Sequence, residues 1–532
     1  MVRFLALFLL CSCLLDVGTQ AQSADRPPPR AETIAEIASK LSTKKPIPEA
    51  SNERLAASDL LTTTALEGSM HYRAFMNRTP VYDRHDVMPP FEVVSFSYEA
   101  DGPDQNRARP VFFLFNGGPG SSTIWLHMTA FGPEKVSVDL EASTESQYHL
   151  SQKANPGFLI DIGDLVFVDP VQTGLTRPMD DAPSKKFQDI RVDARSMCRF
   201  AETWLAANDR NDAPVYLVGS SYGSLRIAGM ASHNSCWDLR KQLQGLVFLS
   251  GFLDLRARAP RSPFRVMGSF PSWASLAWTK DDQLRSEWNA DWVAFLEAAR
   301  SIALEEIGPA LMEDLANLAE KPHTREANVM AFLGLSDIVN IGPSMQVTEL
   351  EIVKHLRDGT RLCPYDTRFS CERGAYLPSQ GLNALGATLE AKLAAYLARQ
   401  MDYTLDVDSY IVAADRMFRV NWNFSFMKSM DGGTGTNMAE VLKTSFRGIA
   451  RMRTRNGQTP TAPRIMVASG AYDIITPFFA MELALVRAGF RKDDLTIHTY
   501  DGGHMMYLDE ETGRQLAADI RSFVLGEEAS DL

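Results

Sequence analysis

The segment 214–231 restricts the fold more than any other feature of the chain. It starts with an apolar run typical of a buried strand and continues into small residues typical of a helix. A G-x-S-x-G pattern stands at the junction, with Gly219 and Gly223 on either side of Ser221. A serine on a tight strand-to-helix turn needs these glycines because side chains would clash there. A plain Gly/Ser turn is the alternative, but this context predicts a nucleophile at Ser221.

Other runs along the chain predict strands that alternate with helices. Strand-like runs occur at 91–98, 109–115, 164–168, 214–218, 244–249, 463–469 and 495–500. Helical patterns occur at 189–208, 285–318, 348–357, 385–399 and 511–525. This alternation predicts an α/β protein with a mostly parallel central sheet. We expect a signal peptide at 1–21, a flexible lead-in at 22–60, a core at 61–252 and 441–532, and a largely helical cap insertion at 253–440.

A second glycine-rich turn follows the apolar run 109–115. Its sequence is NGGPGSS, from Asn116 to Ser122. Such turns often only reverse the chain, but a serine hydrolase of this architecture needs an early loop that donates a backbone N–H to the oxyanion. The second donor is the residue after the nucleophile. Gly118 and Tyr222 are therefore the predicted oxyanion-hole residues.

The two motifs together resemble the serine carboxypeptidase family, whose members carry NGGPG and GESYG at these places. The resemblance extends through VFVDPVQTGLTRP, and the segments LRDGTRLCPYDTRF, SGAYDIITPFFAMELAL and YDGGHMMYLDEE look like bacterial members. It covers the chain from roughly Val93 to the end and is weakest in the cap. It implies the α/β-hydrolase fold and a serine-type hydrolase that cleaves C-terminal peptide bonds.

Two more residues complete a predicted catalytic triad. Asp473 follows the strand-like run 463–469, and His504 follows the run 495–500. The chain order is then Ser, Asp, His, which is the order of α/β-hydrolases. His504 would take the proton of Ser221 and return it to the leaving group, while Asp473 fixes the imidazole tautomer. Taken singly, an Asp or a His is usually structural, so the assignment rests on their joint placement.

The sequence departs from the family where carboxypeptidases bind the C-terminal carboxylate of the substrate. Members resembling this chain use the Asn of NGGPG and two glutamic acids, and here the two acidic positions are Ser220 and Ala130. A close carboxyl pair shares a proton and can hydrogen-bond a carboxylate at acid pH. Without that pair, we expect Asn116, Gly117 and Ser220 to form the substrate-binding residues.

The expected substrate is a peptide with a free C-terminus. An esterase or acyltransferase with the same triad is the alternative, which the missing acid pair favours, and an inactive binding protein is a remote one. We expect no cofactor and no metal site, because the other histidines show no H-x-x-x-H spacing and no Cys/His cluster. The net charge of −12 without a dense basic run argues against nucleic-acid binding.

The N-terminus predicts export to the periplasm or the medium. Arg3 precedes an apolar run at 4–15, and small residues up to Ala21 suit signal-peptidase cleavage. The run is too short to span a bilayer, so stable membrane insertion is not expected. A buried core helix and lipid attachment at Cys13 are the alternatives.

Four of the six cysteines remain after the predicted cleavage site. An even number in an exported chain favours disulfides. Of the three pairings that four cysteines allow, we favour Cys363 with Cys371, which are close in sequence, and Cys198 with Cys236. Buried free thiols are the alternative.

Overall fold

The structure is a computed structural model. It describes residues 49–63, 69–83, 88–102, 108–144, 147–179, 183–255, 257, 262–317, 329, 332–333, 361–372, 375–378, 381–424, 437–457, 459 and 461–527. The predicted signal peptide, most of the predicted lead-in and the helical pattern at 348–357 lie outside these residues.

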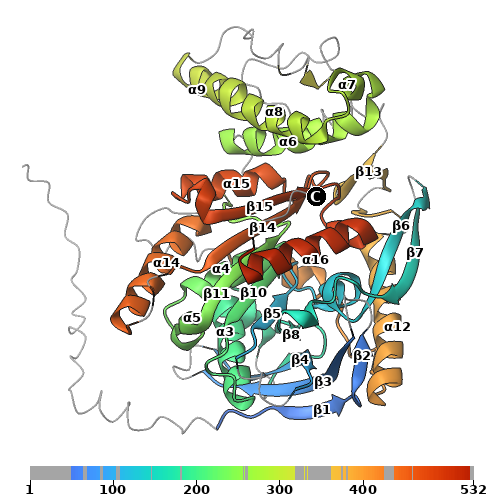
Figure 1. The fold of residues 1–532 in the computed structure, drawn as a ribbon, viewed down its shortest axis with the longest axis vertical. Helices are drawn as coiled ribbons and strands as arrows, with labels where there is room; N and C mark the ends of the chain where they lie inside the picture. The colour runs from blue at the N-terminus through green and yellow to red at the C-terminus, as the bar shows by residue number, and fades with distance from the viewer. Residues whose placement is uncertain are drawn as a thin grey trace, which may run out of the picture. The chain divides into compact units, whose positions relative to one another are not determined.

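An eleven-stranded mixed sheet forms the centre of the described chain (Figure 1). Its main path runs through β1 (Glu53–Ala57), β3 (Met70–Val81), β4 (Phe91–Ala100), β8 (Asp164–Val168), β5 (Val111–Phe115), β10 (Val215–Ser220), β11 (Leu243–Leu249), β14 (Arg464–Gly470) and β15 (Leu495–Tyr500). The strands from β8 to β15 along this path are parallel, and β1, β3 and β4 pair antiparallel. The short strands β2 (Leu61–Thr63) and β9 (Arg177–Pro178) pair with β3 and β4. The predicted α/β fold class with a mostly parallel sheet is confirmed.

Alternate residues of the central strands enter two separate cores. In β5, Phe113 and Phe115 join the core with α3 (Ile190–Ala207), α4 (Gly223–Ser232) and α14 (Met438–Arg455). Phe112 and Leu114 join the core with α12 (Gly381–Met401) and α16 (Glu510–Leu525). Both faces of β5 are therefore covered, which explains its continuous apolar sequence. Each buried phenylalanine contributes about 2 to 3 kcal/mol relative to an exposed one.

The described residues between β11 and β14 are largely helical. Their first part contains α6 (Pro263–Lys280), α7 (Asp282–Glu287), α8 (Trp292–Ile302) and α9 (Gly308–Asn317). These helices build a third core around Phe270, Trp273 and Phe295, which also includes Phe478 and Phe479 of α15 (Phe478–Arg487). A short hairpin of β12 (Leu362–Cys363) and β13 (Asp366–Ser370) precedes α12, and α13 (Arg416–Val420) follows it.

Several strands lie where the sequence predicted none. The strand β3 pairs with β4 from Tyr72 opposite Ala100 to Val81 opposite Phe91. Its polar residues do not alternate cleanly with apolar ones, so no period of two marks this strand in the sequence. The strands β6 (Glu134–Thr144) and β7 (Gln147–Ala154) form a separate two-stranded ribbon. The strand β1 also lies inside the predicted flexible lead-in at 22–60. Residues 53–57 are ordered there because β1 pairs with β3.

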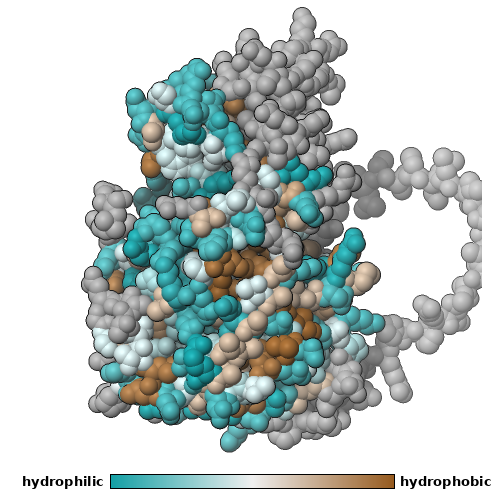
Figure 2. Space-filling view, turned by 90° about the vertical axis from the view of Figure 1, so that its right-hand side faces the viewer, coloured by the Kyte–Doolittle hydropathy of each residue, from teal (hydrophilic) through white to brown (hydrophobic). Residues whose placement is uncertain are grey.

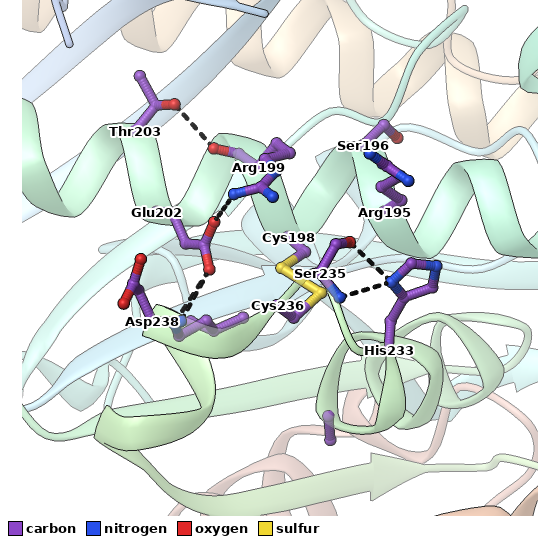
Figure 3. Close-up of a disulfide and its surroundings, with 12 residues drawn as sticks. Arg195, Ser196, Cys198, Arg199, Glu202, Thr203, His233, Ser235, Cys236 and Asp238 are labelled. Atoms are coloured by element: carbon purple, nitrogen blue, oxygen red, sulfur yellow. Dashed lines mark hydrogen bonds and ion pairs between the residues drawn. A yellow bond between two sulfur atoms is a disulfide. The ribbon is translucent and has the colours of Figure 1, made fainter. Parts of the chain in front are cut away.

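Both favoured disulfides are confirmed. Cys198 of α3 is bonded to Cys236, with Cα atoms 5.8 Å apart, and Cys236 lies just before α5 (Trp237–Gln242). Figure 3 shows that His233 lies beside this bond, with Nδ1 3.1 Å from Ser235 N and 2.7 Å from Ser235 Oγ. The second disulfide joins Cys363 to Cys371, with Cα atoms 4.9 Å apart.

Hydrophilic residues cover much of the coloured surface in Figure 2, with apolar residues gathered in patches between them. Among the residues that the structure describes, none of the helices is both long and apolar enough to cross a membrane.

Candidate active site

Ser221 stands on a strained turn between β10 and α4. Its φ of 55° lies in the left-handed region that non-glycine residues rarely adopt. Its N–H donates to Leu249 O at 2.8 Å, which ties the turn to β11. A Cβ on Gly219 would lie 2.4 Å from Gly223 O, and a Cβ on Gly223 would lie 2.7 Å from Phe115 O. Only glycine fits at either position, which is the steric requirement that the sequence predicted for this turn.

Asp473 and His504 meet at the carboxyl end of the sheet. Asp473 follows β14, and His504 follows β15, which is the neighbouring strand. Asp473 Oδ2 lies 2.6 Å from His504 Nδ1, and the two side chains are 0% and 3% exposed. This contact between a buried carboxylate and Nδ1 leaves Nε2 of the ring as the nitrogen that can exchange a proton with a neighbour.

Thr476 supports this pair, and sequence analysis missed it. Its hydroxyl lies 2.5 Å from Asp473 Oδ2, 3.0 Å from His504 Nδ1 and 2.8 Å from Ser250 O. Asp473 Oδ1 accepts hydrogen bonds from Ile475 N at 2.8 Å and Thr476 N at 3.0 Å. Asp473 is therefore held on both oxygens. The phrase DIITP carries the signal, because an Asp followed by Thr three residues later can fold back on its own backbone.

Tyr365 is a second residue that the sequence did not indicate. Its carbonyl accepts a hydrogen bond from His504 N at 2.5 Å, and its ring centroid lies 4.3 Å from that of His504. A Cβ on Gly503 would lie 2.3 Å from Tyr365 O, so the chain needs glycine next to the histidine. Burial raises the pKa of the Tyr365 hydroxyl. Tyr365 belongs to the loop closed by Cys363 and Cys371, and the insertion therefore contributes directly to the surroundings of His504.

A cavity of about 1240 Å³ opens over these groups. Ser221, His504, Asn116, Gly118 and Ser220 line it. The structure thus brings together the predicted nucleophile, the histidine and three of the predicted oxyanion or substrate residues. No hydrogen bond joins Ser221 Oγ to His504 within the described chain, and such contacts often tighten only when substrate binds. Parts of the insertion complete the lining, among them Tyr376, Gly386, Tyr410 and Ala413.

The glycine loop lies directly against the turn that carries Ser221. A Cβ on Gly117 would lie 2.7 Å from Ser221 Cβ and 2.8 Å from Tyr222 N. Gly118 has a φ of +108°. The N–H groups of Gly118 and Tyr222 donate no hydrogen bond within the part of the chain that the structure describes. Both groups are therefore available as donors, and Gly117 acts by permitting the close approach.

The two positions where the family has acids differ in their surroundings. Ala130 is 4% exposed in a π-helical turn (His127–Phe131), and its carbonyl accepts from Asn155 Nδ2 at 2.8 Å. Ser220 lines the cavity, and its Oγ lies 3.5 Å from Tyr507 OH, which also lines it. Burial raises the pKa of Tyr507 to about 12. A neutral pair of hydroxyls therefore stands beside Ser221.

Acidic side chains occur farther along the same cavity. Glu390 of α12 and Asp408 both line it. Burial and the neighbouring Asp408 raise the pKa of Glu390. Within the described ranges, no group of three or more His, Cys, Asp or Glu side chains is placed to hold a metal ion.

Comparison with known proteins finds one matching family and several similar solved structures. Residues 95–259, which contain the glycine loop and the Ser221 turn, match the serine carboxypeptidase family. No curated protein matches the sequence. Similar solved structures include Kex1(Δ)p, a prohormone-processing carboxypeptidase from Saccharomyces cerevisiae. Its sequence is 16% identical, the alignment covers 86% of this chain and 90% of that chain, and the TM-score is 0.46.

Two other solved structures are less similar. The peroxisomal α/β-hydrolase Lpx1 from Saccharomyces cerevisiae has 10% identity over 86% of this chain and 91% of that chain, with a TM-score of 0.34. A protein described as an aryl esterase from Burkholderia cenocepacia has 12% identity over 85% of this chain and 100% of that chain, with a TM-score of 0.33.

The mostly parallel sheet, with Ser221, Asp473 and His504 after β10, β14 and β15 in that chain order, has the arrangement of an α/β-hydrolase. The match of residues 95–259 to the serine carboxypeptidase family confirms the predicted resemblance and supports a serine-type hydrolase.

Proposed function

We propose that Ser221, His504 and Asp473 hydrolyse the C-terminal bond of a peptide through an acyl-enzyme. Ser221 Oγ attacks the scissile carbonyl while His504 takes its proton, and His504 then returns that proton to the leaving amine. Water resolves the acyl-enzyme with the same histidine as base. The observation that carries this proposal is the 2.6 Å contact between Asp473 and His504, because His504 also lines the cavity with Ser221.

Gly118 and Tyr222 are the proposed oxyanion donors. Their N–H groups come from the two loops that flank the nucleophile, and both are free of other acceptors among the described residues. Donors of this kind act on the charge that develops in the tetrahedral intermediate. Loss of one donor typically lowers kcat by roughly 10²- to 10³-fold.

Asn116, Ser220 and Tyr507 are the proposed ligands of the substrate C-terminus. All three line the cavity beside Ser221, and Gly117 lets the loop that carries Asn116 approach. The pKa of Tyr507 is raised to about 12, so its hydroxyl stays protonated through the physiological range. Neutral hydroxyl and amide groups donate hydrogen bonds without first taking up a proton. Binding of the free carboxylate should therefore change little between pH 5 and 8, a range that lies above the ordinary pKa of a carboxyl group and includes that of imidazole.

The test combines active-site labelling with product analysis. The purified protein is treated with an organophosphonate and, separately, incubated with a mixed peptide library and a panel of esters, with products identified by mass spectrometry. We expect label on Ser221 and release of single C-terminal residues. Ser221→Ala is the matched control and should show neither. Substantial turnover by Ser221→Ala on any substrate would refute the assignment.

An esterase or acyltransferase is the second candidate, and the neutral pair of Ser220 and Tyr507 favours it. A carboxylate bound by neutral donors gains only about 1 kcal/mol per hydrogen bond over its uncharged analogue. We therefore expect C-terminal amides and esters to compete comparatively well with the free acid. The comparison uses N-blocked dipeptide acid, amide and ester from pH 4 to 8.

Two variants separate the explanations in that comparison. Ser220→Glu should shift preference toward the free acid at low pH, because it places a carboxyl where the family has one. Glu390→Gln should have little effect, since Glu390 belongs to α12 and not to the Ser221 turn or the glycine loop. Strong rejection of the amide by the unchanged protein, abolished in Glu390→Gln, would assign carboxylate recognition to the acidic side of the cavity instead.

We also propose that the protein is exported, with a mature N-terminus near Gln22. Two disulfides support this, because such bonds persist in oxidising compartments. N-terminal sequencing of the exported protein is the test. Retention of Met1, or a lipid on Cys13, would contradict the proposed cleavage after Ala21.

A further inference from the structure

A buried ion pair lies directly behind the proposed oxyanion hole. Arg226 of α4 donates through Nε to Asp193 Oδ2 at 2.9 Å, and the two side chains are 0% and 5% exposed. Asp193 belongs to α3, so the pair also joins two helices. Neither side chain lines the cavity described above, and neither can touch a substrate there.

Arg226 reaches the glycine loop. Its Nη1 donates to Asn116 O at 2.6 Å. This carbonyl belongs to the peptide group that joins Asn116 to Gly117, one residue before the proposed donor Gly118. A guanidinium on the carbonyl fixes the plane of that peptide and polarises it, because hydrogen bonds in series strengthen one another in a low-dielectric interior.

Asp193 reaches the other half of the hole. Tyr222 OH donates to Asp193 Oδ2 at 2.9 Å, and the guanidinium carbon of Arg226 lies 5.2 Å from the Tyr222 ring centroid. Tyr222 is 1% exposed, and its ring packs edge-on against Trp422 with centroids 5.3 Å apart. The side chain of Tyr222 is thus held by Asp193, while its backbone N lies 2.8 Å from where a Cβ on Gly117 would stand.

We infer that Asp193 and Arg226 are positioning residues that set the geometry of the oxyanion hole. They hold its two donor loops, at Asn116–Gly118 and at Tyr222, in a fixed position relative to each other. This inference rests on the proposed function of Ser221. It goes beyond that proposal because it assigns a catalytic consequence to residues that no substrate contacts. The step they support is unchanged: Ser221 Oγ adds to the carbonyl carbon, the proton passes to His504, and the negative oxygen meets the two N–H groups.

A second buried pair in the chain provides a matched control. Arg210 donates through Nη1 to Asp164 Oδ2 at 2.5 Å, with side chains 5% and 1% exposed, and its Nη2 donates to Arg109 O at 2.7 Å. It therefore repeats the arrangement of a buried carboxylate, an arginine and a backbone carbonyl. Arg109 precedes β5, whereas Asn116 follows it, so the control pair lies at the opposite end of the same strand.

The experiment compares Asp193→Asn, Arg226→Lys and Arg226→Met with Asp164→Asn and Arg210→Met. For each variant, kcat and KM are measured on an N-blocked dipeptide, together with the affinity for a peptidyl boronic acid and the Tm. Ser221 Oγ adds to the boron atom, and the adduct places a negatively charged oxygen in the oxyanion hole. The affinity for the boronic acid therefore reports on the two N–H donors.

We expect Asp193→Asn and Arg226→Met to lower kcat by roughly 10²-fold, because a displacement of about 1 Å in a catalytic group costs that much. Boronic acid affinity should fall by a similar factor while KM changes less than about threefold, since the hole acts on the transition state rather than on the bound substrate. Arg226→Lys keeps a charge and one donor and should lie between. The control variants should lose Tm yet retain kcat and boronic acid affinity.

Three results would overturn the inference or its basis. Folded variants of Asp193 or Arg226 with unchanged kcat and boronic acid affinity would show that the pair is only structural. Equal losses in the Asp164 and Arg210 variants would show a general effect of destabilisation. If the unchanged protein neither reacts with an organophosphonate at Ser221 nor turns over peptides, the proposed function itself fails, and that outcome is separate from the first two. Tyr222→Phe is a milder variant in case the others fail to fold, because it removes only the hydroxyl contact to Asp193. It should lower kcat and boronic acid affinity by a smaller factor.

Discussion

At the scale of single residues, the site depends on a few buried hydrogen bonds whose partners water cannot replace. Asp473 and His504 are almost fully buried, and their side chains contact each other, the Thr476 hydroxyl and, at Asp473, two backbone N–H groups. Removal of a partner from such a group costs more than the hydrogen bond is worth when formed. The effects of substitutions should therefore be large and should fall on kcat.

The triad should behave as one unit. Replacing Ser221 or His504 with Ala should each lower kcat by roughly 10⁴-fold or more, because neither residue works without the other. The double variant should be little worse than either single one. Asp473→Asn should also cost heavily, because an amide at this position favours the wrong imidazole tautomer. Additive losses in the double variant, measured by steady-state kinetics, would show that the two residues act independently.

Thr476 should contribute through Asp473 and His504. Thr476→Val removes a hydroxyl 2.5 Å from Asp473 Oδ2 while keeping the shape of the side chain. A hydrogen bond to a charged group is worth about 1.5 kcal/mol or more, so kcat should fall about tenfold or more. Thr476→Ser keeps the hydroxyl and should retain most activity. Equal kcat values for the Val and Ser variants would mean that the hydroxyl plays no part.

The sequence was most informative where one local pattern forces one geometry. Ser221 could be found because a nucleophile on a strand-to-helix turn requires glycines that are adjacent in sequence. Tyr365 and Tyr507 were missed because their partners come from distant parts of the chain, and no local period or motif encodes such contacts. Thr476 was missed although its partner Asp473 is only three residues away. Tyr507, for example, meets Ser220 across 287 positions of sequence.

At the scale of elements, the same distinction holds. The buried strands β5, β8 and β10 were predicted because both of their faces are covered, which produces a continuous apolar run in the sequence. The strand β3 and the ribbon of β6 and β7 left none, since their ladders depend on partners rather than on apolar content. In the insertion, α8, α9 and α12 overlap predicted helical patterns, whereas α6 was not predicted. The sequence also did not predict which side chains of the insertion would line the cavity.

The loop closed by Cys363 and Cys371 clamps the segments that carry both Asp473 and His504. Pro364 O accepts from Ile474 N at 3.3 Å, and Tyr365 O accepts from His504 N at 2.5 Å. This loop spans 8 positions, against 38 for the disulfide between Cys198 and Cys236. By loop-closure entropy the two bonds contribute about 2.5 and about 4 kcal/mol.

Removal of the two disulfides should therefore have different effects. Cys363→Ser with Cys371→Ser should lower kcat about tenfold at a temperature where the protein stays folded, because the clamp on His504 loosens. Cys198→Ser with Cys236→Ser should lower Tm further but leave kcat near its original value. Activity and thermal unfolding measured on the same samples decide the point. A larger loss of kcat in the second pair would contradict the role of the loop.

At the scale of the whole molecule, buried histidines link stability to pH. Burial lowers the pKa of His127 to about 3, and burial together with Arg195 and Arg199 lowers the pKa of His233 to about 4. In the unfolded chain both groups take a proton near the ordinary value of about 6.5. Between these values the unfolded state binds more protons, so the free energy of unfolding rises with pH, and the stability is lost as pH falls from about 6.5 toward 4.

Asp169 acts in the opposite direction. Burial raises its pKa to about 6, while its Oδ1 accepts from Thr123 N at 2.7 Å beside the glycine loop. The native carboxyl then binds a proton that the unfolded one has already released, so the contribution of Asp169 to stability falls as pH rises from about 4 to about 6. The net slope of the whole protein is a difference between opposed groups, and a single group must be isolated by substitution.

His233→Asn isolates one of them. The amide oxygen of Asn can accept from Ser235 in place of Nδ1, so the variant keeps the local hydrogen bonds but cannot take a proton. Urea unfolding at pH 6.5 and at pH 4.5 should show that the variant loses less stability on acidification than the unchanged protein, by up to about 2 kcal/mol for a shift of this size. His149→Asn, at an exposed position on β7, is the control and should follow the unchanged protein at both pH values. Parallel losses in His233→Asn and the unchanged protein would mean that His233 takes up its proton in the folded state as readily as in the unfolded one, and that its burial is not what links stability to pH.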